Sequence, residues 1–320
     1  MPISRSDLCA AIGTAALCLA LALPAQADEG WPRIIRHDGG ELTLDAPPET
    51  VISASPGLTG TVLALEVPLQ STAAAMVSPI ADDDGFLLQW ADVAHERGVQ
   101  VLYPRLAFDF EAVLAADPDL VIGSSTGADT ILPYLDDLQA MGVPVLVLDY
   151  GRNDWIELAR TLGRATGHEA HAERITQDFA DRAAEAAAKM TRPDGTVSIV
   201  NYGIGGTYAV SKPDSAQARV LTDLGFTVTG LPDDMRGAVL DSREFDFISY
   251  ENLPAAITGE TVFILNGTPE TVRAFLADPV LANLPAVQTG QVYPLGQTSF
   301  RIDYYSGLDI VGTVASYFTE

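Results

Sequence analysis

The sequence holds few of the residues that form covalent cross-links or bind metal ions. Its two cysteines, Cys9 and Cys18, both lie in the first 27 residues, and it has four histidines. Beyond residue 27 the chain therefore has no disulfide and no thiol chemistry. Zinc and manganese carriers usually offer more imidazole ligands, so direct transport of a divalent metal is disfavoured. His168 and His171 could share a helix face, but solvated side chains explain that pair better than a metal site.

Catalytic signatures are also missing. The sequence contains no Gly-x-Ser-x-Gly elbow, no phosphate loop ending in Gly-Lys-Ser/Thr and no His-Glu-x-x-His motif. The glycine-rich segment 203–206 follows a predicted strand but lacks the spacing of a dinucleotide-binding loop. An enzyme would need a nucleophile and a base, and no such pair stands out. We therefore expect a protein that is not an enzyme, and an enzyme on a two-lobed α/β scaffold stays a lesser alternative.

Only one long hydrophobic run occurs, and it lies at the start of the chain. Residues 8–23 are almost all apolar, Arg5 precedes them, and Ala25-Gln26-Ala27 offers a small-x-small cleavage site. The run is short for a membrane span of about 20 residues. These features predict a cleaved signal peptide over residues 1–27 and export to the periplasm. We expect the mature chain to be soluble and monomeric.

Basic residues are scarce relative to acidic ones. The chain has 18 lysines and arginines against 43 aspartates and glutamates, a formal net charge of −25. Such an excess of negative charge disfavours nucleic acid and anionic lipid as partners. We therefore expect neither nucleic-acid binding nor insertion into a membrane, and the acidity itself indicates a solvated surface.

Short runs of Val, Ile and Leu alternate with helical segments through the rest of the chain. The runs lie at 51–54, 120–123 and 143–148 in a first half, and at 197–202, 261–265 and 291–295 in a second half. Runs of this kind that end at Gly, Pro or Asn are typical of buried strands in mainly parallel sheets. Each half is therefore predicted to be an α/β unit. We expect an N-terminal lobe over 28–152, a helical segment over 153–195 and a C-terminal lobe over 196–320.

The helical segment contains one long uninterrupted stretch. Gly167 breaks the segment, and His168 to Met190 then continues without Gly or Pro and with many alanines. This stretch predicts a helix of about 23 residues, or about 35 Å at 1.5 Å per residue. Pro193-Asp194-Gly195 would end it. A helix of that length is expected to be a rigid strut between the lobes.

An internal similarity links the two halves. Phe110-Glu111 opens a short predicted helix that leads to the strand at 120–122, and Tyr250-Glu251 does the same before 261–264. The similarity favours two lobes of related topology. It also places Glu111 and Glu251 at corresponding positions, where a carboxylate is stabilised by the positive end of a helix. Simple capping of those helices explains the two glutamates as readily as a partner does.

Motifs spread over nearly the whole chain resemble those of the periplasmic ferric-enterobactin-binding proteins, in the iron-siderophore and vitamin B12 class of ABC-transporter binding proteins. The matching stretches are Gly30 to Arg33, Ser55 to Leu65, Ala81 to Trp90, Asp214 to Gln217, Leu224 to Phe226, Glu251 to Leu253, Leu284 to Gln288 and Phe300 to Ser306. The resemblance implies two Rossmann-like α/β lobes joined by a single long helix, with the ligand in the cleft between them. It also implies that Glu111 and Glu251 dock against arginines of an inner-membrane permease.

The resemblance implies that cleft arginines and aromatic residues hold an anionic ferric catecholate. It also implies that the siderophore itself holds the iron and that the protein has no cofactor. Arg301 matches the family, in a loop before a predicted helix, where a surface salt bridge to Asp303 is the alternative role. The chain departs from the pattern at 78–80, where the family carries an Arg, and at 211–212, where it carries a Trp. The candidate ligand-binding residues are Arg301, Arg105, Arg243, Lys212 and Tyr304.

Two questions stay open from the sequence. The departures leave room for a related catecholate or another iron chelate, and haem or cobalamin are alternatives within the same class. Adjacent tyrosines can ligate ferric ion directly, and Tyr304-Tyr305 is such a pair. Neighbouring helical residues point about 100° apart, so one ring is expected in the core and the other toward the cleft. We accordingly expect no direct metal ligand from the protein.

Overall fold

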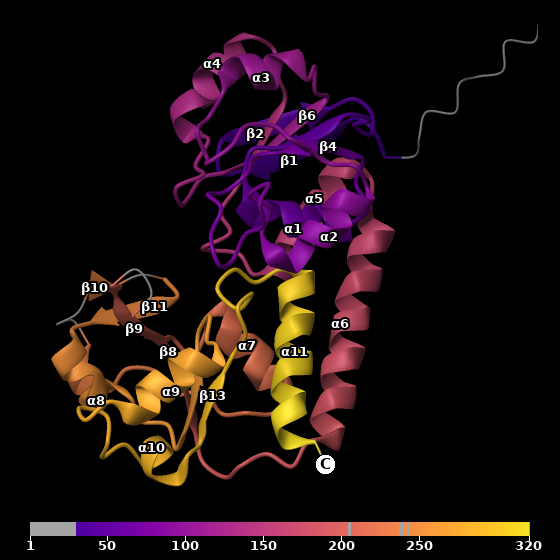
Figure 1. Ribbon diagram of the computed structural model, residues 1–320. Coiled ribbons are helices and arrows are strands. Elements are labelled where there is room, and N and C mark those ends of the chain that lie inside the picture. Colours follow the sequence, from indigo (N-terminus) through magenta and orange to yellow (C-terminus); the bar gives the residue numbers. More distant parts are fainter. Residues whose placement is uncertain (1–29, 204–205, 237–239, 242, 320) are drawn as a thin grey trace, which may run out of the picture.

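A computed structural model describes residues 30–203, 206–236, 240–241 and 243–319. The predicted signal peptide and both cysteines lie outside these residues. Figure 1 shows two α/β lobes, one above the other, with two long helices along one side. The predicted two-lobed architecture is confirmed.

The N-terminal lobe is built on a five-stranded parallel sheet with the order β5-β4-β3-β6-β7. Its strands are β3 (Val51–Ser53), β4 (Leu69–Thr72), β5 (Gln100–Val101), β6 (Leu120–Ser124) and β7 (Val145–Leu148). A hairpin of β1 (Arg33–His37) and β2 (Gly40–Leu44) precedes it. Strands β4 and β5 are added on one side of β3 and strands β6 and β7 on the other, so the order of strand addition reverses between β3 and β6. In open α/β sheets, ligands bind beside the carboxyl ends of the strands at such a switch point.

The C-terminal lobe has a six-stranded mixed sheet with the order β10-β11-β9-β8-β12-β13. Its strands are β8 (Val197–Tyr202), β9 (Tyr208–Ser211), β10 (Leu240–Asp241), β11 (Phe245–Ile248), β12 (Thr261–Ile264) and β13 (Val292–Pro294). Only β8, β12 and β13 are parallel, whereas β9, β10 and β11 run antiparallel to their neighbours. Half of this sheet therefore differs from the predicted parallel arrangement.

Helices cover both sheets and join the lobes. In the N-terminal lobe they are α1 (Pro56–Ala64), α2 (Leu88–Glu96), α3 (Phe110–Ala115), α4 (Leu135–Ala140) and α5 (Trp155–Thr166). The connecting helix is α6 (Glu169–Lys189), and those after it are α7 (Ala216–Asp223), α8 (Leu253–Ala256), α9 (Pro269–Ala277), α10 (Pro285–Thr289) and α11 (Tyr304–Phe318). Short 3-10 turns are η1 (Leu132–Tyr134), η3 (Asp233–Met235) and η4 (Tyr250–Asn252).

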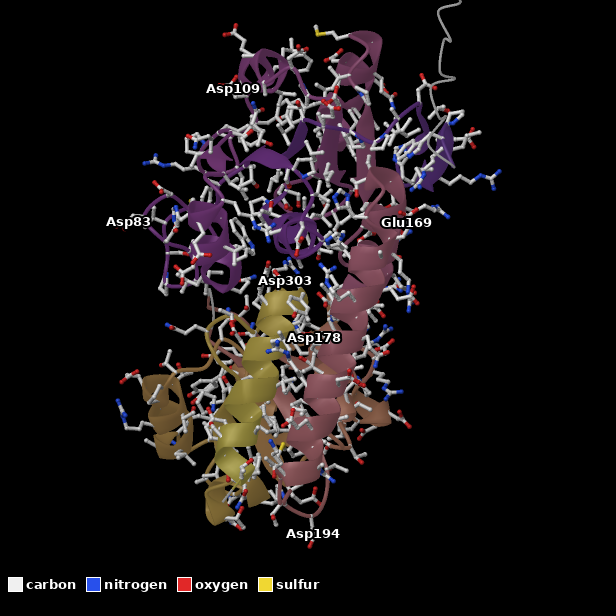
Figure 2. The ribbon with its side chains drawn as sticks, turned by 90° about the vertical axis from the view of Figure 1, so that its right-hand side faces the viewer. Asp83, Asp109, Glu169, Asp178, Asp194 and Asp303 are labelled. Atoms are coloured by element: carbon white, nitrogen blue, oxygen red, sulfur yellow. The ribbon has the colours of Figure 1, made fainter. Side chains whose placement is uncertain are left out.

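The predicted long helix is confirmed as α6, with its ends one residue inside the predicted ones. Gly167 ends α5 with φ near 79°, a backbone conformation that glycine adopts without strain. Helix α11 runs beside α6, and Gly307 allows the two helices to approach closely. A Cβ at that position would lie only 2.9 Å from the Phe179 ring. Figure 2 shows both helices from the side, with Asp178 on α6 and Asp303 at the upper end of α11. These two helices therefore pack along the same side of the molecule.

The amino end of α11 is seated in the N-terminal lobe. Asp303 caps the helix by accepting a hydrogen bond from the Ser306 N–H at 2.9 Å, and it is 3% exposed. It lies against Gly60 of α1, and the Gln89 side-chain amide donates to it at 3.5 Å. Burial raises the pKa of Asp303 to about 6. The loop just before α11, which carries Arg301, is thereby fixed at the junction of the lobes.

Candidate ligand-binding cleft

Tyr150 presents an aromatic face from the N-terminal lobe to the C-terminal lobe. It follows β7 at the carboxyl edge of the parallel sheet, and its hydroxyl donates to Asp129 at 2.6 Å. The Ser55 hydroxyl donates to the same carboxylate. Gly57 makes room for the ring, because a Cβ there would lie 2.8 Å from it. Burial raises the pKa of the Tyr150 phenol well above its usual range, so Tyr150 stays a neutral donor.

Arg301 meets that ring from the C-terminal lobe. The carbon at the centre of its guanidinium lies 4.7 Å from the centroid of the Tyr150 ring and 4.6 Å from that of Phe300. A planar cation between two aromatic faces is held by cation–π attraction. The Arg301 side chain is 31% exposed. The structure thus brings Arg301 to the junction of the lobes.

Glu244 is the acidic partner of Arg301. Its Oε2 lies 3.6 Å from the Arg301 Nη1, and its side chain is 17% exposed. The salt bridge to Asp303 considered from the sequence is therefore wrong. Burial raises the pKa of Glu244, whereas Arg301 and the backbone N–H of Ala216 act against that rise. A partly buried ion pair accordingly lies at the edge of the cleft.

The other predicted basic residues lie in different surroundings. Arg243 lines a small cavity of 40 Å³ bounded by both lobes, together with Tyr150 and Glu244. The Lys212 Nζ lies 3.8 Å from an Asp246 carboxylate oxygen. Arg105 is exposed in the loop after β5, at the same carboxyl edge of the sheet as Tyr150. Arg243 is therefore grouped with Arg301, and Lys212 and Arg105 stay predicted contacts.

Tyr304 turns toward the connecting helix. Its hydroxyl donates to Asp178 of α6 at 2.6 Å, and its ring packs edge-on against Trp155. Tyr305 is likewise half-buried against the core. The predicted split between a core ring and a cleft ring is therefore not observed. A ligand contact from Tyr304 stays a prediction, with its hydroxyl already bonded within the protein.

A larger cavity lies behind the cleft. It measures 440 Å³ and is bounded by the start of α5, by α6 and by α7. Asp154, the cap of α5, forms an ion pair there with Arg219 of α7. This contact and the Tyr150–Arg301 contact hold the same two lobes together at two places.

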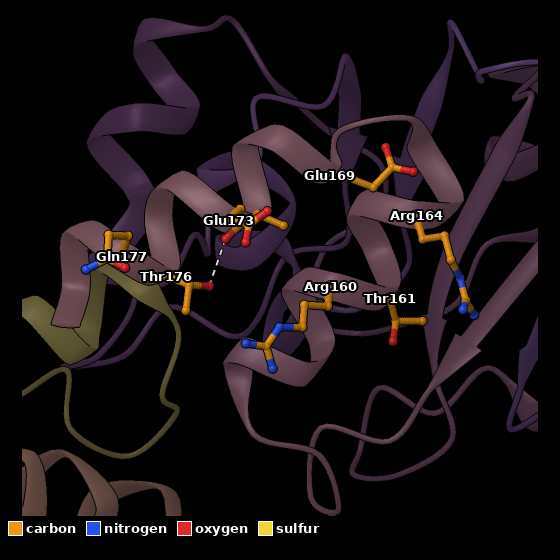
Figure 3. A pocket seen from close by; sticks show the side chains of 8 residues that line it. Arg160, Thr161, Arg164, Glu169, Glu173, Thr176 and Gln177 are labelled. Carbon is orange, nitrogen blue, oxygen red and sulfur yellow. Dashed lines mark hydrogen bonds between the residues drawn. The ribbon is translucent and has the colours of Figure 1, made fainter. Parts of the chain in front are cut away.

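Another cavity, of 530 Å³, lies elsewhere. Figure 3 shows it between α5 and α6, with Arg160 and Arg164 on one helix and Glu169 and Glu173 on the other. Its walls come from two adjacent helices and not from both sheets. It has no aromatic lining that could stack on a planar ligand. The junction of the lobes is therefore the better candidate site despite its smaller volume.

Other kinds of site find no support among the described residues. Among the described residues, no three His, Cys, Asp or Glu side chains are grouped so as to hold a metal ion. His168 and His171 lie 5.4 Å apart between ring centroids, and the His171 imidazole pairs with Glu66. In the part of the chain that the structure describes, no helix is both long and apolar enough to cross a membrane.

Glu111 and Glu251 are both exposed, one on each lobe. Glu111 lies in the first turn of α3, which Asp109 caps by accepting from the Ala112 N–H at 3.0 Å. Glu251 lies in η4, and hydrogen bonds to its own backbone N–H and to Ser249 lower its pKa. Each helical turn leads to a buried strand, β6 or β12, so the predicted internal similarity is confirmed at the level of structure.

Comparison with known proteins defines the class. Residues 51–298 match the family described as periplasmic binding protein, and the chain belongs to that family. It is a family of substrate-binding proteins and not of enzymes. The match and the relatives below confirm the resemblance drawn from the sequence motifs.

Individual relatives agree with this assignment. The chain is 39% identical over 293 residues to the ferric enterobactin-binding periplasmic protein FepB of Escherichia coli, covering 90% of this chain and 91% of that one. The crystal structure of holo-ViuP superposes with a TM-score of 0.82 at 34% identity, covering 91% and 96% of the two chains. Staphylococcus aureus SirA complexed with staphyloferrin B has a TM-score of 0.69 at 16% identity, covering 89% and 97%, and so shares the fold.

Sequence reasoning missed three residues of this junction. Tyr150, Asp129 and Glu244 belong to no motif, and only the folded chain brings them to Arg301. A signal for Tyr150 was present, because it comes just after the buried strand at 145–148, where ligands of α/β sheets gather. Glu244 had no comparable signal.

Proposed function

We propose that this protein captures a ferric siderophore of the enterobactin-like catecholate type in the periplasm and delivers it to an inner-membrane ABC transporter for iron uptake. The observation that carries the proposal is the Arg301 guanidinium, held between the Tyr150 and Phe300 rings where the two lobes meet. The relative named for ferric enterobactin, which is similar over nine-tenths of the chain, supports the same ligand class.

The chemistry of this junction suits a ferric catecholate. Such a ligand presents flat aromatic rings and a net negative charge, because three catecholates around Fe³⁺ carry more charge than the ion balances. Arg301 offers a planar cation for the negative charge, and the Tyr150 and Phe300 rings beside it offer aromatic surface for contact with the catechol rings. Arg243 adds a second cation from the same side.

In this proposal the iron arrives already bound by the siderophore. The described residues offer no group of three metal-binding side chains, and the Tyr304 hydroxyl is bonded to Asp178. The protein then recognises the outer surface of the complex and needs no ligand atom of its own for the metal.

The proposed partner is the permease dimer of the transporter. Glu111 and Glu251 are exposed acidic groups on separate lobes, so each could meet one subunit. The carboxylate of Glu251 accepts hydrogen bonds from its own backbone N–H and from Ser249. Two exposed acidic groups would favour electrostatic docking to basic residues, which mainly speeds association.

Replacing Arg301 tests the proposed site. We expect Arg301→Ala to weaken binding of a ferric catecholate by about 2–5 kcal/mol, the usual effect of truncating a partly buried charge that contacts a ligand. Its melting temperature should fall, because the mostly buried Glu244 loses its cationic partner, so affinity is measured at a temperature where the variant is folded. Arg273→Ala is the control, because Arg273 pairs with Glu270 on the exposed face of α9. Unchanged affinity in Arg301→Ala would remove Arg301 from the site.

A further inference from the structure

Glu244 is an unexpected residue in a cleft for an anionic ligand. Its carboxylate lies 3.6 Å from the cation that the proposed function assigns to that ligand, and it is mostly buried. A carboxylate at this place repels any anion that approaches Arg301. Removing it from water is itself unfavourable, as the raised pKa of Glu244 indicates. Neither effect helps a site that only has to attract negative charge.

The surrounding cations are balanced in the same way. Lys212 lies 3.8 Å from Asp246, Arg152 lies 3.1 Å from Asp149, and Arg219 pairs with Asp154. Together with Arg301 and Glu244, these are four cations and four carboxylates, so their charges cancel. Arg243 adds one positive charge and Asp214 one negative charge at the small cavity. Asp129, bonded to Tyr150, adds a further negative charge, so the described part of the junction has no excess of positive charge.

We propose that Glu244 is a specificity-determining residue, which lowers the affinity of the cleft for ferric chelates of high negative charge and so favours those of lower charge. The proposal rests on the proposed function, that the cleft binds a ferric siderophore. Because Coulomb energy is proportional to the charge of the ligand, the repulsion from Glu244 grows with that charge. Apolar contact of the ligand with the Tyr150 and Phe300 rings does not depend on that charge.

The test compares two ligands that share catecholate rings but differ in charge. A ferric tris-catecholate is a trianion, and a ferric bis-catecholate with a neutral third arm is a monoanion. We expect Glu244→Gln to bind the trianion about tenfold more tightly than the wild-type protein, and the monoanion about twofold more tightly. Gln keeps the shape and an acceptor for Arg301. Glu270→Gln is the matched control, because it makes the same charge change on exposed α9.

The outcomes separate the two proposals. An equal change for both ligands, or weaker binding of the trianion, would overturn the specificity role and leave Glu244 as a residue that positions Arg301. Failure of the wild-type protein to bind either chelate would instead refute the proposed function.

A second measurement needs no variant. Because the junction has no excess of positive charge, wild-type affinity for the trianion should not fall between roughly 20 and 500 mM NaCl. A tenfold fall over that range would show an excess of positive charge in the cleft and would also overturn the specificity role.

Discussion

Gly60→Ala tests whether α11 is seated in the N-terminal lobe as described. A Cβ at Gly60 would overlap the Asp303 carboxylate and lie 2.8 Å from the Trp90 ring. Both neighbours are buried, at 3% and 0% exposure, and Asp303 is held by its capping bond to Ser306. Neither group can move aside without breaking a packed contact at the junction of the lobes.

The expected magnitude follows from two opposing effects. Forcing an extra methyl group into a packed interior costs about 1–3 kcal/mol. Replacing glycine by alanine in a helix returns about 1 kcal/mol. Since two buried groups would be displaced, we expect the cost of the overlap to lie at the upper end of that range. The free energy of unfolding should then fall by about 2 kcal/mol in total. For a protein of this size that corresponds to a melting temperature lower by about 4–8 °C.

The assay is thermal unfolding followed by circular dichroism, with Gly312→Ala as the matched control. Gly312 lies on the exposed side of α11, and a Cβ there would meet nothing within 4 Å. The same chemical change should therefore stabilise the protein by up to about 1 kcal/mol. If Gly60→Ala melted at or above the wild-type temperature, the close contact between α1 and α11 would be refuted.

Three other outcomes follow from contacts described above. Because burial raises the pKa of Asp303 to about 6, above its ordinary value of 3.8, folding favours the protonated form, and stability falls as the pH rises from about 4 through 6. In chemical denaturation, the free energy of unfolding of Asp303→Asn should exceed that of the wild type by up to about 3 kcal/mol between pH 5 and 7. Parallel curves of unfolding free energy against pH for the two proteins would contradict this. Tyr304→Phe should lose about 1 kcal/mol of stability with its bond to Asp178 and keep the charge-transfer colour of a bound ferric siderophore. Loss of that colour would indicate a tyrosinate ligand. The double variant Glu111→Ala, Glu251→Ala should bind siderophore normally and fail to support uptake, and normal uptake would exclude the docking role.

Features encoded locally were predictable from the sequence. The long helix followed from an alanine-rich stretch without Gly or Pro, and its start followed from Gly167, which the structure places in the left-handed conformation. The buried parallel strands followed from continuous apolar runs such as 120–123. The strands β9 and β11 were missed because they are short and, in an antiparallel arrangement, mix polar with aromatic residues.

The site was only partly predictable, for a physical reason. Arg301 was found because it lies in a recognisable segment before a helix. Its contacts Tyr150 and Glu244 are far from it in sequence, and no local pattern indicates which distant side chains a fold brings together. The role of Tyr304 was the least predictable, because its direction depends on how α11 packs against α6. The domain limits and the ligand contacts remain predictions.

A binding titration tests the central claim most directly. Trp155 lies beside the cavity behind the cleft, and its fluorescence together with that of Trp90 at the junction can report a bound ferric complex. The titrants are ferric catecholate, hydroxamate and carboxylate siderophores, with haem and cobalamin as controls. The account predicts saturable quenching by the ferric catecholate at the lowest concentrations of the series. Saturable binding of haem or cobalamin, with no response to any ferric siderophore, would contradict it.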